Sequence, residues 1–543
     1  MLARPDAAGL ALDSLLAAQN KGLLRFITCG SVDDGKSTLI GRLLYETKLL
    51  YEDQLAALEA DSRKFGTQGG GLDFALLVDG LAAEREQGIT IDVAYRFFTT
   101  ERRKFIVADT PGHEQYTRNM ATGASTADLA VILVDARKGP TAQTRRHSLI
   151  VSMLGVRHVV VAVNKMDLVG WSEPVFRRIA AAYGAFAAPL GFRDVLCIPM
   201  AALTGDNIVT RSPHAAWYRG PTLLDHLETV EVDAGAANRP FRMPVQWVNR
   251  PDSSFRGYAG LIAQGAVRPG AKVRVMPSGR ETRVARIVTF DRDLDHAAAG
   301  RSVTLTFADD IDVSRGDVVS DATQPARVSD RLLARVLWTG EDALVPGRSY
   351  FVKLGTRTAI ATIAALRHKI DLADLRPIPA ERLAANEIGA AMLALDRPVA
   401  FDRYSECRDT GSFILIDRES CDTVGMGLIE DEAPSLQAGS SPGRVPADAR
   451  AGEGAGRRQL FGRAGERPWR SLLKAVSWRA TGSLDTTVLA FLFTGDLKVS
   501  AAIGLTEIGT KIALYYGHER IWARIPFGKA ARADVEARPA RPG

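Results

Sequence analysis

The chain has few cysteines and few histidines for its length, and this scarcity excludes several classes of site. Four cysteines and eight histidines occur among 543 residues. The cysteines (Cys29, Cys197, Cys407 and Cys421) form no C-x-x-C pair, and no histidine cluster accompanies them. Neither a disulfide framework nor a zinc site is indicated, so we expect reduced, mostly buried thiols of a cytoplasmic protein.

The N-terminus also lacks the charged and then apolar pattern of a secretory signal peptide. The remaining composition is ordinary, with 46% hydrophobic and 24% charged residues, and is typical of soluble globular proteins. A chain of 543 residues is too long for one hydrophobic core. Three to four domains are therefore expected.

The basic character of the chain is confined to its C-terminal part. The whole chain has 69 Lys and Arg against 63 Asp and Glu. Residues 431–543 hold 17 basic and 11 acidic residues, which leaves 52 of each in the rest. Because the body carries no net charge, the basic pI is no argument for nucleic-acid binding.

Residues 30–37 (GSVDDGKS) form the most informative pattern, because they fit G-x-x-x-x-G-K-[ST] between an expected strand at 25–29 and an expected helix from residue 38. Backbone N–H groups of such a loop converge on phosphate oxygens at a helix N-terminus. Lys36 is expected to reach the β- and γ-phosphates. The residues predicted to bind nucleotide here are Gly30, Ser31, Val32, Asp33, Asp34, Gly35, Lys36, Ser37 and Thr38.

Two further segments supply the expected metal ligands. An apolar strand at 104–108 leads into Asp109-Thr-Pro-Gly-His113, where Asp109 is placed to hold Mg²⁺ through water and Gly112 to contact the γ-phosphate. Thr90, in the polar segment that precedes this strand, offers a second hydroxyl beside that of Ser37. The predicted metal ligands are therefore Ser37, Thr90 and Asp109.

The base is expected to be guanine. A strand at 156–163 ends in Asn164-Lys-Met-Asp167, and a carboxylate at Asp167 accepts hydrogen bonds from guanine N1–H and the exocyclic amine, which adenine does not offer. Lys165 belongs to the same motif, and Asn164 is expected to brace the loop. After the next strand come Ala201, Ala202 and Leu203, where a backbone N–H near Ala202 is expected to contact guanine O6. Four ordered motifs, each at a strand end, predict a P-loop GTPase with GTP and Mg²⁺ as its cofactors.

The motifs also resemble those of the translation-factor class of GTPases, through Val32, Gly88-Ile-Thr90 and Asp109-Thr-Pro-Gly-His113. The resemblance implies that His113 positions the attacking water and that Val32 and Ile89 flank it as a hydrophobic gate. The alternative for His113 is a polar loop residue satisfied by backbone.

Longer stretches narrow the resemblance. Residues 30–44, 77–90 and 113–120 are similar to the large, GTPase subunit of heterodimeric bacterial sulfate adenylyltransferase, and the similarity runs from about residue 20 to 430. It implies GTP hydrolysis that drives adenylyl sulfate synthesis from ATP and sulfate on a small catalytic partner subunit. That family usually has Ser where this chain has Ala201, so weaker bracing of the base loop is expected, without loss of guanine recognition.

The expected fold is an α/β P-loop domain (residues 20–235) followed by two β-barrels (238–325 and 328–430). Short β-branched runs separated by turns indicate the barrels. Arg357, His368 and Asp402 are candidates for a partner contact, although solvated barrel loops are the favoured interpretation. We expect a flexible linker over 431–468, rich in Gly, Ala, Ser, Pro and Arg. No second phosphate loop follows Glu430, so no adenylylsulfate kinase activity is expected.

A two-helix hydrophobic module is predicted over 469–528. Residues 476–495 and 497–517 are each long enough to cross a bilayer, and basic residues flank both outer ends. Asp485 and Glu507 are costly within a membrane unless they face a protein interior. The module resembles small two-helix membrane domains of unknown function. It predicts a protein tethered to the cytoplasmic face of the inner membrane, and the alternative is a soluble hairpin packed on another subunit.

Two other functions stay open at this stage. One is a translation factor that acts on the ribosome, against which the uncharged body argues. The other is a membrane-anchored GTPase switch, in which hydrolysis regulates the hairpin.

Overall fold

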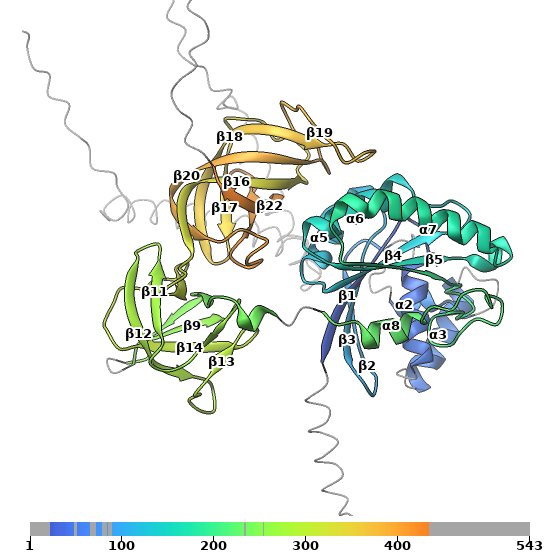
Figure 1. The fold of residues 1–543 in the computed structure, drawn as a ribbon, viewed down its shortest axis with the longest axis horizontal. Helices are drawn as coiled ribbons and strands as arrows, with labels where there is room; N and C mark the ends of the chain where they lie inside the picture. The colour runs from blue at the N-terminus through green and yellow to red at the C-terminus, as the bar shows by residue number, and fades with distance from the viewer. Residues whose placement is uncertain are drawn as a thin grey trace, which may run out of the picture. The chain divides into compact units, whose positions relative to one another are not determined.

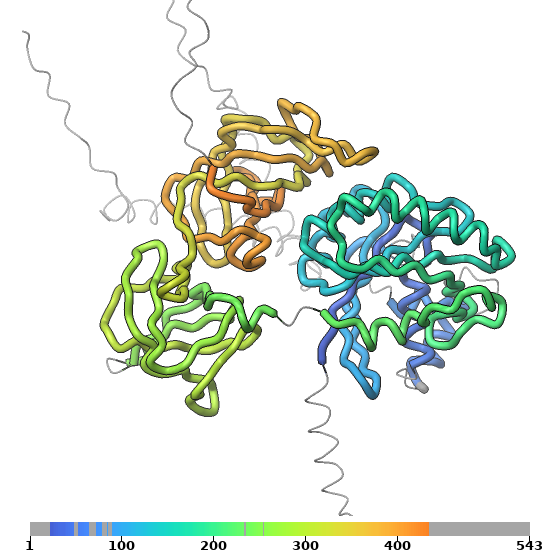
Figure 2. The backbone as a smooth tube through the Cα atoms, in the orientation of Figure 1, coloured from blue at the N-terminus to red at the C-terminus, as the bar shows by residue number. Residues whose placement is uncertain are grey.

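The structure is a computed structural model that describes residues 22–47, 52–65, 72–78, 84, 90–232, 235–252 and 255–433. Ile89 and the hydrophobic module at 469–528 lie outside these residues, as does the linker beyond residue 433. The last strand reaches Glu432, so Asp431 and Glu432, which we expected in the linker, belong to that strand. Figure 2 traces the backbone from the N-terminal domain, coloured blue to green, to the third domain, coloured yellow to orange.

The N-terminal domain is built on a six-stranded sheet in the order β2-β3-β1-β4-β5-β6. All strands run parallel except β2, which pairs antiparallel with β3 at the sheet edge. Near-continuous apolar sequence explains why the central strands are buried on both faces, as in β4. The strands are β1 (Leu23–Cys29), β2 (Ala94–Thr99), β3 (Lys104–Asp109), β4 (Leu129–Asp135), β5 (His158–Asn164) and β6 (Asp194–Pro199).

Helices cover both faces of this sheet (Figure 1). Alternate residues of β4 point to opposite sides: Ile132 packs in the core beneath α5, α6 and α7, and Val131 in the core beneath α2 and α8. The helices are α2 (Lys36–Glu46), α3 (Glu52–Phe65), α5 (Thr117–Ser125), α6 (Ala142–Met153), α7 (Glu173–Ala187) and α8 (Leu223–Thr229). Short 3₁₀ turns are η1 (Phe74–Leu77), η2 (Glu114–Tyr116), η3 (Met166–Val169), η4 (Ala188–Leu190) and η5 (Gly235–Asn238).

This doubly wound arrangement decides where the motifs meet. The strands β1, β3 and β5 end at Cys29, Asp109 and Asn164, and each is followed by a motif recognised in the sequence. Because carboxyl ends of parallel strands share one edge of a sheet, the motifs gather there.

The second domain is an antiparallel seven-stranded sheet in the order β7-β15-β11-β12-β14-β9-β8. It closes on itself because the Ala263 N–H donates to the Arg242 carbonyl, and the Arg242 N–H to that of Gln264, both at 2.9 Å. The sheet strands are β7 (Arg242–Pro244), β8 (Trp247–Asn249), β9 (Gly257–Leu261), β11 (Lys272–Met276), β12 (Arg280–Val288), β14 (Ser302–Phe307) and β15 (Val318–Asp321); β10 (Ala266–Val267) and β13 (Ala297–Ala298) form a separate pair.

The third domain is a closed antiparallel barrel. Its strand order is β17-β21-β22-β16-β20-β18-β19, and an additional pairing of β17 with β18 completes the circle. Inward residues such as Trp338, Tyr350 and Phe401 fill it. Its strands are β16 (Arg327–Trp338), β17 (Ser349–Leu354), β18 (Arg357–Ile370), β19 (Pro377–Ile378), β20 (Ile388–Phe401), β21 (Ser412–Ile416) and β22 (Thr423–Glu432).

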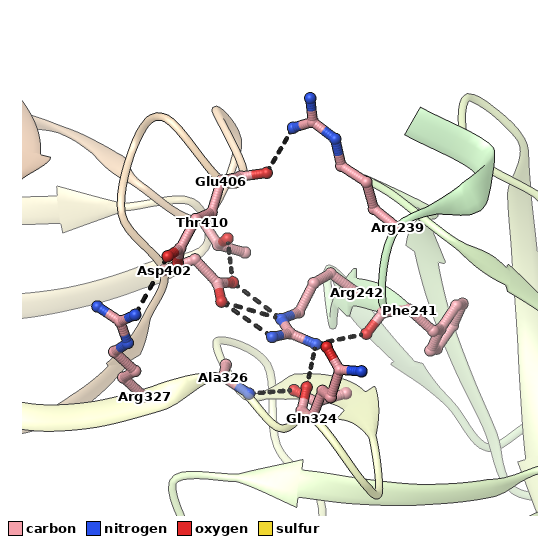
Figure 3. A network of polar contacts seen from close by, with 10 residues as sticks. Arg239, Phe241, Arg242, Gln324, Ala326, Arg327, Asp402, Glu406 and Thr410 are labelled. Atoms are coloured by element: carbon pink, nitrogen blue, oxygen red, sulfur yellow. Dashed lines mark hydrogen bonds and ion pairs between the residues drawn. The ribbon is translucent and has the colours of Figure 1, made fainter. Parts of the chain in front are cut away.

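A buried ion pair joins the two barrels (Figure 3). The Arg242 guanidinium donates to both carboxylate oxygens of Asp402 at 2.9–3.2 Å, and both residues are at most 4% exposed. The Thr410 hydroxyl donates to the same carboxylate at 2.7 Å. Our interpretation of Asp402 as a solvated loop residue or a partner contact is therefore wrong. A buried carboxylate needs a counter-charge, and that counter-charge lies 160 positions away in the chain.

Within the described residues, no helix combines the length and apolarity that crossing a bilayer requires.

Candidate nucleotide-binding site

A cavity of about 460 Å³ opens at the carboxyl edge of the six-stranded sheet. All four motifs contribute to its wall. The residues that line it are Val32, Asp33, Gly35, Lys36, Ser37, Thr38, Asp73, Ala75, Thr90, Gly112, His113, Asn164, Lys165, Asp167, Leu168, Ala202 and Leu203. Five residues of the predicted nucleotide site (Gly30, Ser31, Asp34, Asp109 and Ala201) are not among them.

The phosphate loop connects β1 to α2 through a glycine that no other residue replaces easily. Gly35 caps α2 with φ of 90°, in the left-handed region, and a Cβ there would lie 2.6 Å from Asn164 Nδ2. The first turn of α2 therefore points its free N–H groups toward the cavity, where they can bind an anion.

Lys36 lies folded back over this loop. Its ammonium donates to the Ser31 carbonyl at 2.8 Å and to that of Gly30 at 3.4 Å. The side chain is buried, and burial lowers the pKa of Lys36 although Asp109 and Asp34 oppose that shift. The loop therefore holds one buried cation in place beside the helix N-terminus, which suits a polyphosphate.

The side chain of Asp34 faces away from the cavity. Its carboxylate turns inward, is 1% exposed, and accepts from the Ser31 N–H at 2.6 Å. Burial raises the pKa of Asp34 to about 6. The side chain shapes the loop from within, and it does not reach the cavity.

The three predicted metal ligands lie together. The Ser37 hydroxyl donates to Asp109 Oδ2 at 2.7 Å and lies 3.3 Å from the Thr90 hydroxyl. Thr28 holds the other oxygen of Asp109 at 2.8 Å. Burial raises the pKa of Asp109, since little solvent reaches it. Two hydroxyls and a carboxylate are the hard oxygen donors that Mg²⁺ prefers, so the donor set fits that ion.

The segment after β3 returns to the phosphate loop. A Cβ on Gly112 would lie 2.5 Å from Lys36 Nζ and 2.8 Å from the Val32 N, so only glycine permits this approach. His113 follows at the cavity wall with its side chain exposed, and its Nδ1 accepts from the Gln115 N–H at 3.3 Å. Val32 lies on the same wall.

The base-recognition motifs form the far end of the cavity. Asn164 is buried and joins two loops: its Nδ2 donates to the Asp34 carbonyl and its Oδ1 accepts from the Ala202 N–H, both at 2.8 Å. The bracing role predicted for Asn164 matches these contacts. The Ala202 N–H is used in this contact, so the guanine O6 contact predicted for a backbone N–H near Ala202 would fall to a neighbouring N–H. Asp167 and Leu203 line the cavity.

Several residues support this site although none of the sequence motifs includes them. Asp135, at the end of β4, accepts from Arg137 at 2.6–3.0 Å and lies 3.3 Å from Lys165 Nζ. Burial raises its pKa, but the Arg137 and Lys165 contacts outweigh that effect and hold the pKa of Asp135 at about 2. The carboxylate thus anchors Lys165 in the base loop.

Glu84 is a second such residue. Its carboxylate is 3% exposed and accepts from the N–H groups of Ile91 and Asp92 at 2.9 and 3.2 Å. It therefore holds the backbone directly after Thr90. A third is His147 of α6, whose Nδ1 accepts from the Gly30 N–H at 3.1 Å.

Comparisons with known proteins agree with this geometry. Residues 21–232 match the family described as the elongation factor Tu GTP binding domain, and residues 331–430 match the GTP-eEF1A C-terminal domain-like family. The sulfate adenylyltransferase subunit 1 of Methylorubrum extorquens is 57% identical over 464 residues, which cover 84% of this chain and 98% of that protein. This chain belongs to the sulfate adenylyltransferase subunit 1 family.

Further relatives support the same family. The sulfate adenylyltransferase subunit 1 of Aeromonas hydrophila is 59% identical over 76% of this chain and 87% of its own length. The bifunctional enzyme CysN/CysC of Xylella fastidiosa is 58% identical, again over 76% of this chain, which spans 66% of that longer protein. Residues 472–523 match a family described as a predicted membrane protein. The predicted family and the order of a GTPase domain before a β-barrel domain are thus confirmed.

Proposed function

We propose that this chain is the GTP-hydrolysing subunit of a sulfate adenylyltransferase. In that reaction sulfate and ATP yield adenylyl sulfate and pyrophosphate, an uphill step that GTP hydrolysis on this chain drives. The observation that carries the proposal is one cavity lined by four GTPase motifs, in a chain 57% identical to a sulfate adenylyltransferase subunit 1.

The nucleotide is proposed to lie with its phosphates on the loop and its base at Asp167. Lys36 exchanges its two carbonyl contacts for β- and γ-phosphate oxygens, since a charged phosphate is the better acceptor. Asp167 accepts from the guanine N1–H and amine. Because the Ala202 N–H already donates to Asn164, we assign the O6 contact to the N–H of Leu203.

Mg²⁺ is proposed to sit at Ser37, Thr90 and Asp109, where it supplies charge neutralisation of the β- and γ-phosphates. The Ser37 hydroxyl, which now donates to Asp109, turns to offer its oxygen. Thr28 keeps Asp109 in place during that change through its 2.8 Å hydrogen bond.

Hydrolysis is proposed to depend on His113. Its exposed ring stands on the cavity wall beside the γ-phosphate end, where it can orient a water for attack. Gly112 packs on the loop and brings His113 near the phosphates. Val32 and Ile89 are proposed as the hydrophobic gate beside the water, by resemblance to translation-factor GTPases.

Adenylyl transfer is proposed to occur on a separate, smaller subunit. A subunit 1 requires a partner, and the GTPase motifs account for the nucleotide cavity found among the described residues.

The hydrophobic module at 469–528 is proposed to anchor this cytoplasmic chain to the inner membrane, supported by the match of residues 472–523 to a predicted membrane family. Deleting residues 457–543 is expected to move the protein from membranes to the soluble fraction without changing GTP turnover. If the full-length protein is soluble without detergent, the proposed membrane anchor is contradicted.

GTP turnover and adenylyl sulfate formation test the main proposal. Both are measured for the purified chain with and without the small subunit encoded in the same genome. Mutual stimulation is the expected result. If the small subunit does not change the rate of GTP hydrolysis and no adenylyl sulfate forms, a translation factor or a membrane-anchored GTPase switch is favoured instead.

A further inference from the structure

Two side chains from separate parts of the chain hold the backbone directly after Thr90. The Ile91 N–H donates to Glu84 Oε1 at 2.9 Å, and the Asp92 N–H donates to the same oxygen at 3.2 Å. The Ile91 carbonyl accepts from Asn119 Nδ2 at 2.8 Å. Both backbone polar groups of Ile91 are therefore bound by side chains, which lie 7 and 28 positions away in the chain.

The sheet does not supply these contacts, because β2 begins only at Ala94, which pairs with Asp109 of β3. Residues 90–93 thus precede the ladder of backbone hydrogen bonds. Backbone polar groups away from a ladder are paired by side chains or by water. Glu84 suits this role, because its carboxylate is 3% exposed and a hydrogen bond to a charged acceptor is roughly twice as strong as a neutral one.

Helix α5 packs closely against the same segment. Asn119 and Gly123 are four residues apart on α5, so they lie on one face of the helix. A Cβ on Gly123 would lie 3.4 Å from Val93 Cγ1 and 3.0 Å from Thr110 Cγ2, so the helix approaches both the segment before β2 and the segment after β3. The amide of Asn119 is therefore carried by a helix whose own position is fixed by packing.

The held backbone determines where the Thr90 hydroxyl lies. That hydroxyl is 3.3 Å from the Ser37 hydroxyl, within the predicted set of metal ligands. The Ile91 N–H belongs to the same rigid peptide plane as the Thr90 Cα, so a hydrogen bond to that N–H also fixes the start of the Thr90 side chain. Glu84 and Asn119 do not line the cavity, so neither is placed to bind the metal itself.

We propose that Glu84 and Asn119 are positioning residues for the magnesium site, and that they act through Thr90. We call these two side chains the clamp. Because the clamp holds the backbone at Ile91, the Thr90 hydroxyl need not be ordered when Mg²⁺ binds. The inference rests on the proposed function, since it takes guanine nucleotide with Mg²⁺ as the ligand of the cavity.

The clamp acts by removing an ordering cost. Fixing the backbone of one residue lowers an equilibrium constant by roughly tenfold. Without the clamp, Mg²⁺ binding must order Thr90 itself, so the contribution of Mg²⁺ to nucleotide affinity should fall by about that factor. Affinity without Mg²⁺ should not change, because the phosphate loop is held by contacts of its own, such as that between Lys36 and the Ser31 carbonyl.

Affinity for a fluorescent, non-hydrolysable GTP analogue, measured on the full-length chain with Mg²⁺ and with EDTA, tests the clamp. Glu84→Ala and Asn119→Asp are each expected to weaken binding about tenfold in Mg²⁺ and to leave binding in EDTA unchanged. Glu84→Gln should recover most of the loss, because an amide oxygen still accepts from both N–H groups. Glu101→Ala in the turn between β2 and β3 and Thr122→Ala on α5 change exposed side chains. They are the matched controls and should bind as wild type does.

A Thr90→Ala background shows whether the clamp acts through this hydroxyl. There, Glu84→Ala and Asn119→Asp should have little further effect on the Mg²⁺ dependence, since the ligand that the clamp positions is already gone. Hydrogen exchange in the nucleotide-free chain gives a second readout. The amides of Ile91 and Asp92 should exchange at least about tenfold faster in Glu84→Ala, which removes their charged acceptor, and at the wild-type rate in the controls.

Three results would overturn this inference alone. Weakening by the same factor in Mg²⁺ and in EDTA would show a general loss of the nucleotide site. Wild-type affinity of both clamp variants in Mg²⁺ would show that Thr90 needs no positioning. An undiminished effect in the Thr90→Ala background would show that the clamp acts elsewhere. If the wild-type chain binds no GTP analogue in either condition, the proposed nucleotide site is refuted and this inference with it.

Discussion

The ion pair between Arg242 and Asp402 allows the stability of the barrel junction to be predicted in detail. Arg242→Met removes three hydrogen bonds to the Asp402 carboxylate and leaves it with the Thr410 hydroxyl as its remaining side-chain partner. The Gln324 carbonyl, which accepts from Arg242 Nη1 at 2.8 Å, also loses its donor.

Breaking a buried pair from one side costs about 3–5 kcal/mol, because it leaves an uncompensated buried charge. Replacing both partners by apolar residues costs much less, since no charge is then buried. We therefore expect Arg242→Met to destabilise the junction by about 3–5 kcal/mol, and Asp402→Leu in the same chain to recover most of that loss.

Hydrogen exchange measured by mass spectrometry provides the assay, because a multidomain chain has no single free energy of unfolding. Peptides from β7 and β20 should exchange roughly 100- to 4,000-fold faster in Arg242→Met, the factor that corresponds to this free energy. Peptides from β4 and β5, in the N-terminal domain, serve as an internal reference and should keep their rates.

An exposed ion pair in the second domain, the barrel that contains Arg242, is the matched control. Arg286 donates to both oxygens of Asp293 at 2.6 and 3.1 Å, but the two side chains are 56% and 44% exposed. Arg286→Met should change stability by at most about 1 kcal/mol. If both arginine variants exchange alike, burial does not control the cost, and the reasoning is refuted.

Three further predictions concern the nucleotide domain. Asp167→Asn should shift nucleotide preference from GTP to XTP, because an amide donor replaces a carboxylate oxygen that accepts from guanine. Unchanged selectivity in competition binding would contradict the assignment of Asp167 to the base. His113→Ala should slow single-turnover hydrolysis about 100-fold or more and spare GTP affinity, whereas loss of affinity would indicate a structural role. His147 takes a proton near its usual pKa when unfolded but only near pH 3 when folded, so its contribution to stability is present above about pH 6.5 and is lost as the pH falls toward 3. The difference in melting temperature between wild type and His147→Asn should therefore shrink from pH 7 to pH 4, and a difference independent of pH would refute this.

Much of the nucleotide site could be predicted because its chemistry is local. Gly35 must adopt a left-handed φ at the start of a helix, and Lys36 and Ser37 follow it directly, so a short pattern specifies all three. Asp109 and Asp167 could equally be recognised from the sequence, since Asp109 ends a strand and Asp167 follows one. Parallel strands end at one edge of a sheet, and this topology alone brings such residues together.

Sequence patterns fall short where a neighbour in space decides what a residue does. Asp34 lies within the phosphate-loop motif predicted to bind nucleotide, and the motif does not show that its carboxylate turns inward to the Ser31 N–H. Asp402 was interpreted as a solvated loop residue, but its partner Arg242 belongs to the other barrel and lies 160 positions away in the chain.

The sequence by itself determined the family, the guanine nucleotide and the order of a GTPase domain before a β-barrel domain, because these depend on contiguous motifs and on the periodicity of short segments. Only the tertiary structure decided which polar groups are buried and with whom they pair. The hydrogen bond from the Gly30 N–H to His147 exists because helix α6 passes behind the phosphate loop, and the Arg242–Asp402 pair exists because two barrels meet. Burial makes an unpaired charge or donor costly, and burial is a property of packing that no local sequence pattern records.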